Sequence, residues 1–140
     1  MKKSLLIVLA TVLSISAFAQ ITVPKISTPA KPSVTDFIKP PAIGDITKTT
    51  GGIVDALASQ LGLPGTQKPA LTSAVSSFLG TKSGIMGLAT SNPTQYLSKF
   101  NPLQAGLFTK LKGIMGAAKF ASFLKLKPAN AGNVLSNLFF

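Results

Sequence analysis

The sequence predicts an all-α fold: a small bundle of four to five short helices, preceded by a signal peptide and a proline-rich extended leader. Three observations lead to this prediction. From residue 45 onward, apolar residues recur every three or four positions, as they do on one face of a helix. Gly, Pro and Asn interrupt this pattern at intervals that suit short helices. The alternating apolar and polar runs of an outer-membrane barrel are absent.

Residues 1–19 have the layout of a secretory signal peptide. Two lysines form a positive n-region, residues 5–15 form an apolar stretch, and Ala17 and Ala19 supply the small residues of a cleavage site. We therefore expect cleavage before Gln20 and export to the periplasm, the cell surface or the medium. The alternative is an uncleaved membrane anchor, but the apolar stretch is shorter than the roughly 20 residues that span a bilayer. A lipoprotein is excluded because the chain contains no cysteine.

Residues 20–44 predict an extended or disordered leader, because they include five prolines. Proline fixes φ and lacks an amide donor, so neither a helix nor a central strand is expected. Two interpretations remain open: a tether that holds the domain away from a surface, and a strap that docks loosely through a few apolar residues. In either case the leader should pack little, and its removal should leave the melting temperature nearly unchanged.

The domain is expected to occupy residues 45–140. Asp45 is a favoured N-cap residue, and Gly62 is a favoured residue just beyond a helix end, so together they bound a first helix. Gly51 and Gly52 lower the helix propensity, which favours a start after them.

A second helix is predicted between Thr66, as its N-cap, and Gly80, as its terminating glycine. Its apolar residues follow the clearest amphipathic pattern in the chain. They are Leu71, Ala74, Val75, Phe78 and Leu79. A short third helix is expected to start at Ser83 and to reach Ala89.

The pattern Asn-Pro-x-Gln occurs twice, at residues 92–95 and 101–104. Asparagine is a strong N-cap and proline suits the first helical position, so each copy predicts a helix start. The second copy is expected to open the longest helix, about residues 102–126. The last turns of that helix are apolar nearly all round, which indicates burial or an interface. Residues 133–140 are expected to form a last short helix or an apolar tail.

A short internal echo, Gly-Ile-Met-Gly, occurs at residues 84–87 and again at residues 113–116. Small residues on one helix face allow two backbones to approach closely. The echo therefore favours tight packing of two helices in a soluble bundle, and the alternative is the small-residue packing of membrane helices.

The charge is strongly one-sided. After removal of residues 1–19 the chain has twelve lysines against three aspartates, with no Arg, Glu or His, and no acidic residue follows Asp55. Such a field attracts anionic lipid, lipopolysaccharide or acidic glycans, although it can also serve only solubility. The candidate contacts with an anionic surface are Lys110, Lys112, Lys119, Lys125 and Lys127. Specific nucleic-acid recognition is not expected, because arginine is absent and the chain is expected to be exported.

No catalytic residue, metal or cofactor is predicted. The lack of Cys, His and Glu removes the usual ligands of transition metals and most acid–base pairs. Residues 122–125 match the Ser-x-x-Lys pattern of penicillin-binding enzymes, but the accompanying Lys-Ser-Gly stands in the reverse order and the chain is too short for that fold. We expect a protein that is not an enzyme.

These features predict a non-enzymatic binding or structural module of the cell envelope or secreted space, with an anionic surface or another envelope protein as its partner. The alternative is a membrane-active protein, lipid-binding or bacteriocin-like. Residues 108–127 have the composition of a cationic peptide that lies among lipid headgroups. Because the lysines are not confined to one face of that segment, the binding or structural module is favoured.

Overall fold

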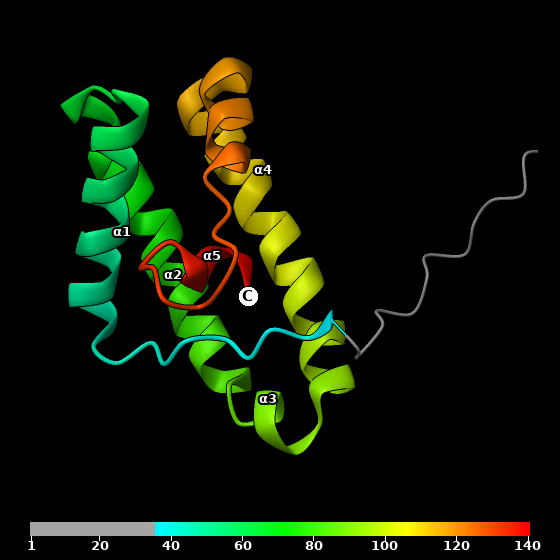
Figure 1. Cartoon of the computed structure of the whole chain (residues 1–140). Helices are drawn as coiled ribbons and strands as arrows, with labels where there is room; N and C mark the ends of the chain where they lie inside the picture. The colour runs from blue at the N-terminus through cyan, green and yellow to red at the C-terminus, as the bar shows by residue number, and fades with distance from the viewer. Residues whose placement is uncertain (1–35) are drawn as a thin grey trace, which may run out of the picture. The chain divides into compact units, whose positions relative to one another are not determined.

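The computed structural model describes residues 36–140, so the predicted signal peptide and the first part of the leader lie outside the described residues. Within residues 36–140 the regular elements are helices and no strand occurs, which confirms the all-α prediction (Figure 1). The elements in chain order are α1 (Ile46–Leu61), a 3₁₀ turn η2 (Gly65–Gln67), α2 (Lys68–Ile85), α3 (Leu88–Ser91), α4 (Pro93–Lys125) and α5 (Ser136–Phe139).

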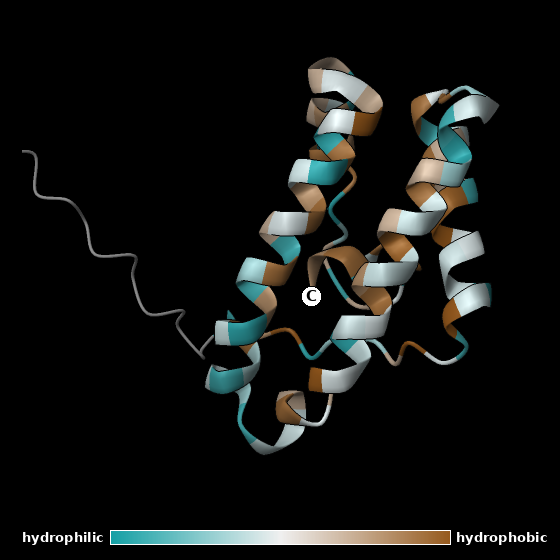
Figure 2. Cartoon of the chain, turned by 180° about the vertical axis from the view of Figure 1, so that it is seen from behind, coloured by the Kyte–Doolittle hydropathy of each residue, from teal (hydrophilic) through white to brown (hydrophobic). Residues whose placement is uncertain are grey.

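Three long helices surround the C-terminal segment, residues 134–140. Helix α2 packs against both α1 and α4, and the segment returns between the three helices with α5 near the middle (Figure 1). Figure 2 shows strongly apolar colour on this last turn of the chain. Leu135 and Leu138 are almost completely enclosed, so the last residues of the chain form part of the core.

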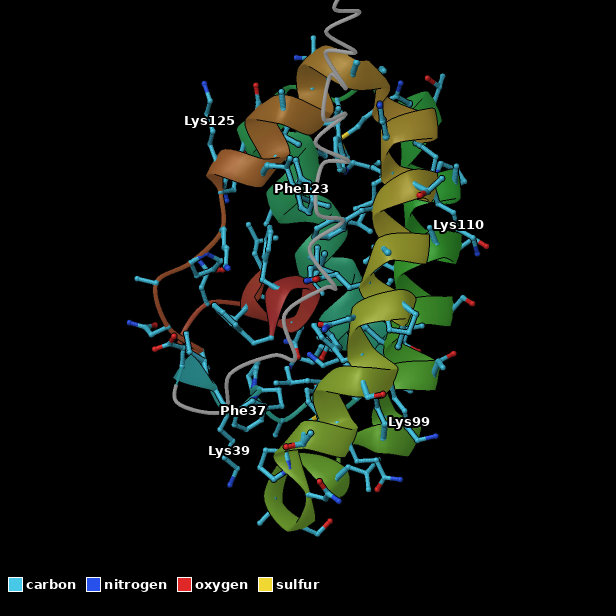
Figure 3. All side chains as sticks on the ribbon, turned by 90° about the vertical axis from the view of Figure 1, so that its right-hand side faces the viewer. Phe37, Lys39, Lys99, Lys110, Phe123 and Lys125 are labelled. Atoms are coloured by element: carbon cyan, nitrogen blue, oxygen red, sulfur yellow. The ribbon has the colours of Figure 1, made fainter. Side chains whose placement is uncertain are left out.

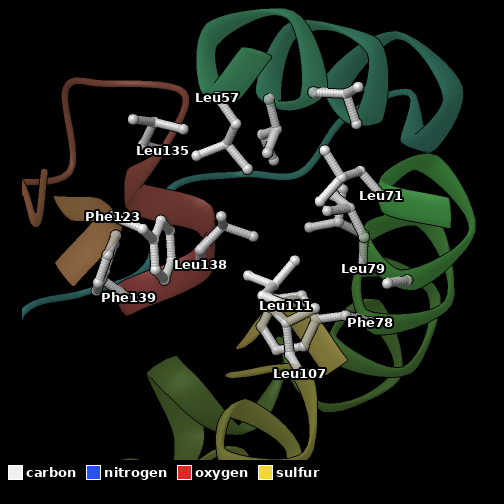
Figure 4. Packing of buried hydrophobic residues seen from close by; sticks show 14 of the residues in the cluster. Leu57, Leu71, Phe78, Leu79, Leu107, Leu111, Phe123, Leu135, Leu138 and Phe139 are labelled. Atoms are coloured by element: carbon white, nitrogen blue, oxygen red, sulfur yellow. The ribbon is translucent and has the colours of Figure 1, made fainter. Parts of the chain in front are cut away.

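The C-terminal segment contacts each long helix through a different side chain. A Cβ atom on Gly52 of α1 would lie 3.5 Å from the Val134 side chain, and the ring of Phe139 stacks on Phe123 of α4 with centroids 5.1 Å apart (Figure 4). On the α2 side, the Lys82 amine donates a hydrogen bond to the Asn137 carbonyl at 2.7 Å. The predicted last helix is thus confirmed as α5, in an apolar setting.

Three predicted helix ends are confirmed. The Asp45 carboxylate accepts a hydrogen bond from the Lys48 amide at 2.7 Å, and the Asn92 side chain accepts one from the Gln95 amide at 3.1 Å. Gly62 ends α1 in the left-handed conformation, with φ 59°. Each cap satisfies backbone groups that the helix itself leaves unpaired.

Other predicted boundaries are wrong. Helix α1 starts at Ile46, so the glycine pair at 51 and 52 does not delay it. Thr66 does not cap α2: a 3₁₀ turn comes first, and the N-cap position is Gln67. Helix α2 also continues past Gly80, because the apolar face extends another turn and buries Lys82. Burial of a continuous face outweighs the propensity cost of about 1 kcal/mol per exposed glycine.

The second Asn-Pro motif does not start a helix. Helix α4 runs through Asn101 and Pro102 without interruption. Proline removes one backbone hydrogen bond, but Phe100 and Leu107 on either side are buried in the core and keep both halves of the helix in place. The longest helix therefore begins at Pro93, nine residues before the predicted start at residue 102.

The actual break in α4 lies at Gly116, whose φ of 80° and ψ of 164° are not helical. In a straight helix, Phe108 and Phe123 would lie about 22 Å apart along the axis at 1.5 Å per residue. Their ring centroids are 5.4 Å apart. The turn at Gly116 folds the end of α4 back, so that Phe108, Phe120, Phe123 and Phe139 form one aromatic cluster.

The Gly-Ile-Met-Gly echo marks places where a helix ends or bends, and the predicted close approach of two helices is wrong. The first copy spans the end of α2 at Ile85, and the second contains the turn at Gly116. A Cβ atom built on any of the four glycines would meet nothing within 4 Å.

The described part of the leader, residues 36–44, is extended and lies across the helices; we call it the strap (Figure 1). Ile43 is 7% exposed and belongs to the core, and Pro40 is buried. The Thr49 hydroxyl donates a hydrogen bond to the Ile43 carbonyl at 2.5 Å. The expectation that residues up to 44 pack little is therefore wrong for the strap, because its apolar side chains cover part of the core.

Candidate functional site

A cavity of about 470 Å³ opens where the strap, helix α4 and the C-terminal segment meet; we call it the strap cavity. Its lining is mostly apolar, with five aromatic side chains. The lining residues are Asp36, Phe37, Ile38, Tyr96, Leu97, Phe100, Asn101, Gln104, Lys127, Phe139 and Phe140. Ligand sites of proteins usually have a volume in this range, with apolar side chains and a few polar groups in the lining.

The aromatic wall of the strap cavity is internally packed. The Phe37 ring meets Tyr96 edge-on with centroids 5.9 Å apart, and Tyr96 stacks on Phe100 at 5.4 Å. Tyr96 and Phe100 are one helical turn apart on α4, which places both rings on the same face. A rigid helix thus supplies one wall, and the strap supplies the ring that closes over it.

The polar groups of the cavity come from all three elements. Asp36 lies on the strap, Asn101 and Gln104 lie on α4, and Lys127 follows α4. The Gln104 amide nitrogen donates a hydrogen bond to the Leu138 carbonyl at 2.8 Å, which fixes the C-terminal segment to α4. The Lys127 amine lies 5.5 Å from the centroid of the Phe140 ring.

Lys82 stands behind the Phe100 ring and is completely buried. Its amine lies 5.4 Å from the ring centroid and donates to the Asn137 carbonyl. Among residues 36–140 the one salt bridge joins Lys68 to Asp55, so no carboxylate pairs with the Lys82 amine. Desolvation therefore lowers the pKa of Lys82 to about 7.

Tyr96 is also completely buried, and its hydroxyl has no hydrogen-bond partner among the described residues. Burial raises the pKa of Tyr96, since the phenolate would lose its hydration. An unpaired hydroxyl in a buried position costs free energy that a hydrogen-bonding neighbour would recover. The hydroxyl oxygen is enclosed by the domain itself and is not open to the strap cavity.

The five lysines predicted to contact an anionic surface do not gather in one place. The Lys119 amine donates to the Leu61 carbonyl at the end of α1, where a cation caps the helix. Lys127 belongs to the strap cavity. Lys110 and Lys112 are exposed on α4, but two residues differ by about 200° around a helix and lie at opposite edges of its exposed face. Figure 3 shows Lys125 on the other side of the molecule from Lys110.

Two further hollows lie side by side between α2 and α4, and they share Ala74, Ser77 and Lys110 in their linings. The walls of these two hollows contain no buried polar group without a partner among the described residues. The strap cavity, with five aromatic side chains and three converging segments, is the better-built site.

Sequence reasoning missed Lys82 and the strap cavity. A signal for Lys82 existed, because residue 82 continues the three- and four-residue spacing of Phe78 and Leu79 into the buried face of α2. The cavity had no local signal, since its walls come from segments at residues 36–38, 96–104 and 127–140.

Comparison with protein-family models gave no match, and comparisons with curated proteins and with solved structures gave none either. Within residues 36–140, no helix is both long enough and apolar enough to cross a membrane.

Proposed function

We propose that this chain is an exported, non-enzymatic binding module of the cell envelope or secreted space, and that it takes its ligand in the strap cavity. The observation that carries the proposal is the cavity itself. It holds about 470 Å³ and brings five aromatic side chains to one place. Pockets of this kind bind small apolar or amphiphilic molecules through contact area, with a few polar groups to orient them.

The packing of α4 favours this function over direct membrane action. A cationic peptide that enters a bilayer needs a free apolar face. In the folded domain, Leu107, Leu111 and Phe123 are buried against neighbouring elements. The exposed large apolar side chains of residues 36–140 are Leu124 and Val134, with exposed fractions of 44% and 37%. Membrane action would therefore require the end of α4 to leave the core.

A fluorescence titration tests the proposal. Tyr96 is the only tyrosine of the chain, tryptophan is absent, and Tyr96 lines the cavity. The neutral apolar probe N-phenylnaphthylamine should bind at one site per chain, gain emission and accept energy from Tyr96. Absence of saturable binding would reject the cavity as a ligand site.

Two matched variants locate the binding. Asn101→Phe adds a ring at the cavity, whereas Thr109→Phe adds the same ring to an exposed position of α4 outside it. Asn101→Phe should weaken probe binding about tenfold, because a filled pocket loses contact area, and Thr109→Phe should leave it unchanged. Equal effects of the two variants would place the probe elsewhere. In parallel, release of dye from anionic vesicles by the unaltered protein would favour membrane action instead.

A further inference from the structure

We propose that the ligand of the strap cavity is a single-chain amphiphile with an anionic head, whose hydrocarbon chain lies against the half-buried apolar side chains of the lining and whose head lies beside Lys127. This inference rests on the proposed function and adds the chemical class of the ligand. It is carried by two observations: the division of the cavity lining into an apolar wall and a polar margin, and the sign of the charge around it.

The apolar wall suits a hydrocarbon chain. Tyr96 is fully enclosed and Phe100 is 2% exposed, so both rings back the cavity from within the core. The apolar surface that a ligand can reach comes from the half-buried side chains of Phe37, Ile38, Leu97 and Phe140. Dispersion contacts with this apolar surface do not depend on direction, so they favour a flexible hydrocarbon chain over a polar solute. The polar side chains of the lining are few. A ligand with one polar head and one hydrocarbon chain therefore suits this cavity.

The charge around the cavity favours an anionic head. Residues 36–140 contain ten lysines and three aspartates, one of which is paired with Lys68. Lys127 is the one cation in the lining. Asp36 also lines the cavity and is exposed, as Lys127 is, so water and salt screen both charges alike. The sign of the potential at the cavity is then set by the excess of lysines over aspartates in the whole domain.

Three probes with the same chain separate the tail from the head. These are ω-bromoundecanoate, its uncharged methyl ester, and ω-bromoundecyl trimethylammonium, each used below its micelle concentration with the whole protein. Bromine quenches tyrosine emission at short range, so quenching of Tyr96 reports the chain end in the cavity. We expect the carboxylate to bind about tenfold more tightly than the ammonium at low salt, and the difference to shrink as salt screens the charges.

A matched pair of variants tests Lys127. Lys127→Gln should weaken binding of the carboxylate about threefold, a typical loss for an exposed ion pair, and should leave the ester unaffected. Lys125→Gln removes the same charge from an exposed residue outside the cavity lining and should leave binding of the carboxylate nearly unchanged. Equal losses in both variants would overturn the assignment of the head to Lys127.

The outcomes distinguish this inference from the function on which it rests. Equal quenching by all three probes would overturn the anionic head and leave the cavity as an apolar binding site. Quenching by the ammonium probe alone would show that the cavity prefers a cationic head, and would overturn the proposed anionic head. Absence of quenching by every probe would overturn both the ligand class and the proposed function.

Discussion

At the scale of single residues, Lys82 is the most unusual feature of the domain. A buried amine without a carboxylate partner favours its neutral form, and its pKa falls from 10.5 to about 7. It nevertheless makes two specific contacts, with the Asn137 carbonyl and the face of Phe100. Lys82 thus connects α2, the C-terminal segment and the wall of the strap cavity.

Lys82 predicts a pH-dependent stability. Between pH 7 and about 10, unfolding takes up a proton at this amine, so the free energy of unfolding should rise with pH by up to about 1.4 kcal/mol per unit. Below pH 7 the amine is protonated in both states and the slope should vanish. Above pH 10 the raised pKa of Tyr96 opposes the trend. Urea titrations of Lys82→Met should lack the slope between pH 7 and 10, and those of the exposed Lys110→Met variant should retain it.

At the scale of elements, the turn at Gly116 organises the aromatic cluster. Its φ of 80° and ψ of 164° lie in a region that only glycine adopts readily. We expect Gly116→Ala to lower the free energy of unfolding by about 1–3 kcal/mol. Gly113→Ala is the control, because Gly113 is helical and open to the same small addition; it should be neutral or stabilising by up to about 1 kcal/mol. Equal destabilisation by both would show that the turn is not required.

The strap makes its own prediction. Because Ile43 is buried and belongs to the core, Ile43→Ala should lower the free energy of unfolding by about 2 kcal/mol or more. Lys39→Ala, at an exposed strap position, should change it by less than about 0.5 kcal/mol. Chemical denaturation measures both. If the free energy of unfolding of Ile43→Ala were unchanged, the strap would contribute little to the stability of the domain.

The amphipathic spacing and the helix boundaries at Asp45, Gly62 and Asn92 were predictable, whereas the boundaries predicted at Thr66, Gly80 and Asn101 are wrong and the long-range arrangement was not predicted. Asp45 and Asn92 act locally, so their capping could be inferred from the sequence. Pro102 shows the limit of such reasoning, because contacts made by distant residues keep the helix intact around it. No local sequence pattern could predict the strap cavity, because it forms only when residues 36–38 meet α4 and residues 127–140.

At the scale of the whole molecule, the apolar residues and the lysines serve different purposes. The phenylalanines of residues 108–127, the segment whose composition suggested a membrane-active helix, form the aromatic cluster with Phe139. The lysines are dispersed: one is buried, one caps α1, one lines the cavity, and others such as Lys99 and Lys110 extend from α4 (Figure 3). This division agrees with the proposed binding module, in which a folded domain has one defined site and a diffuse positive field around it.

The most direct test of this account is a titration of ¹⁵N-labelled protein with undecanoate, followed by NMR. The account predicts saturable shifts centred on Tyr96, Asn101 and the side-chain amide of Gln104, with small changes at Lys99, Lys110 and Lys112. Shifts that follow those exposed lysines while the cavity residues stay unchanged would contradict it, and would show that the charged surface, not the strap cavity, binds the ligand.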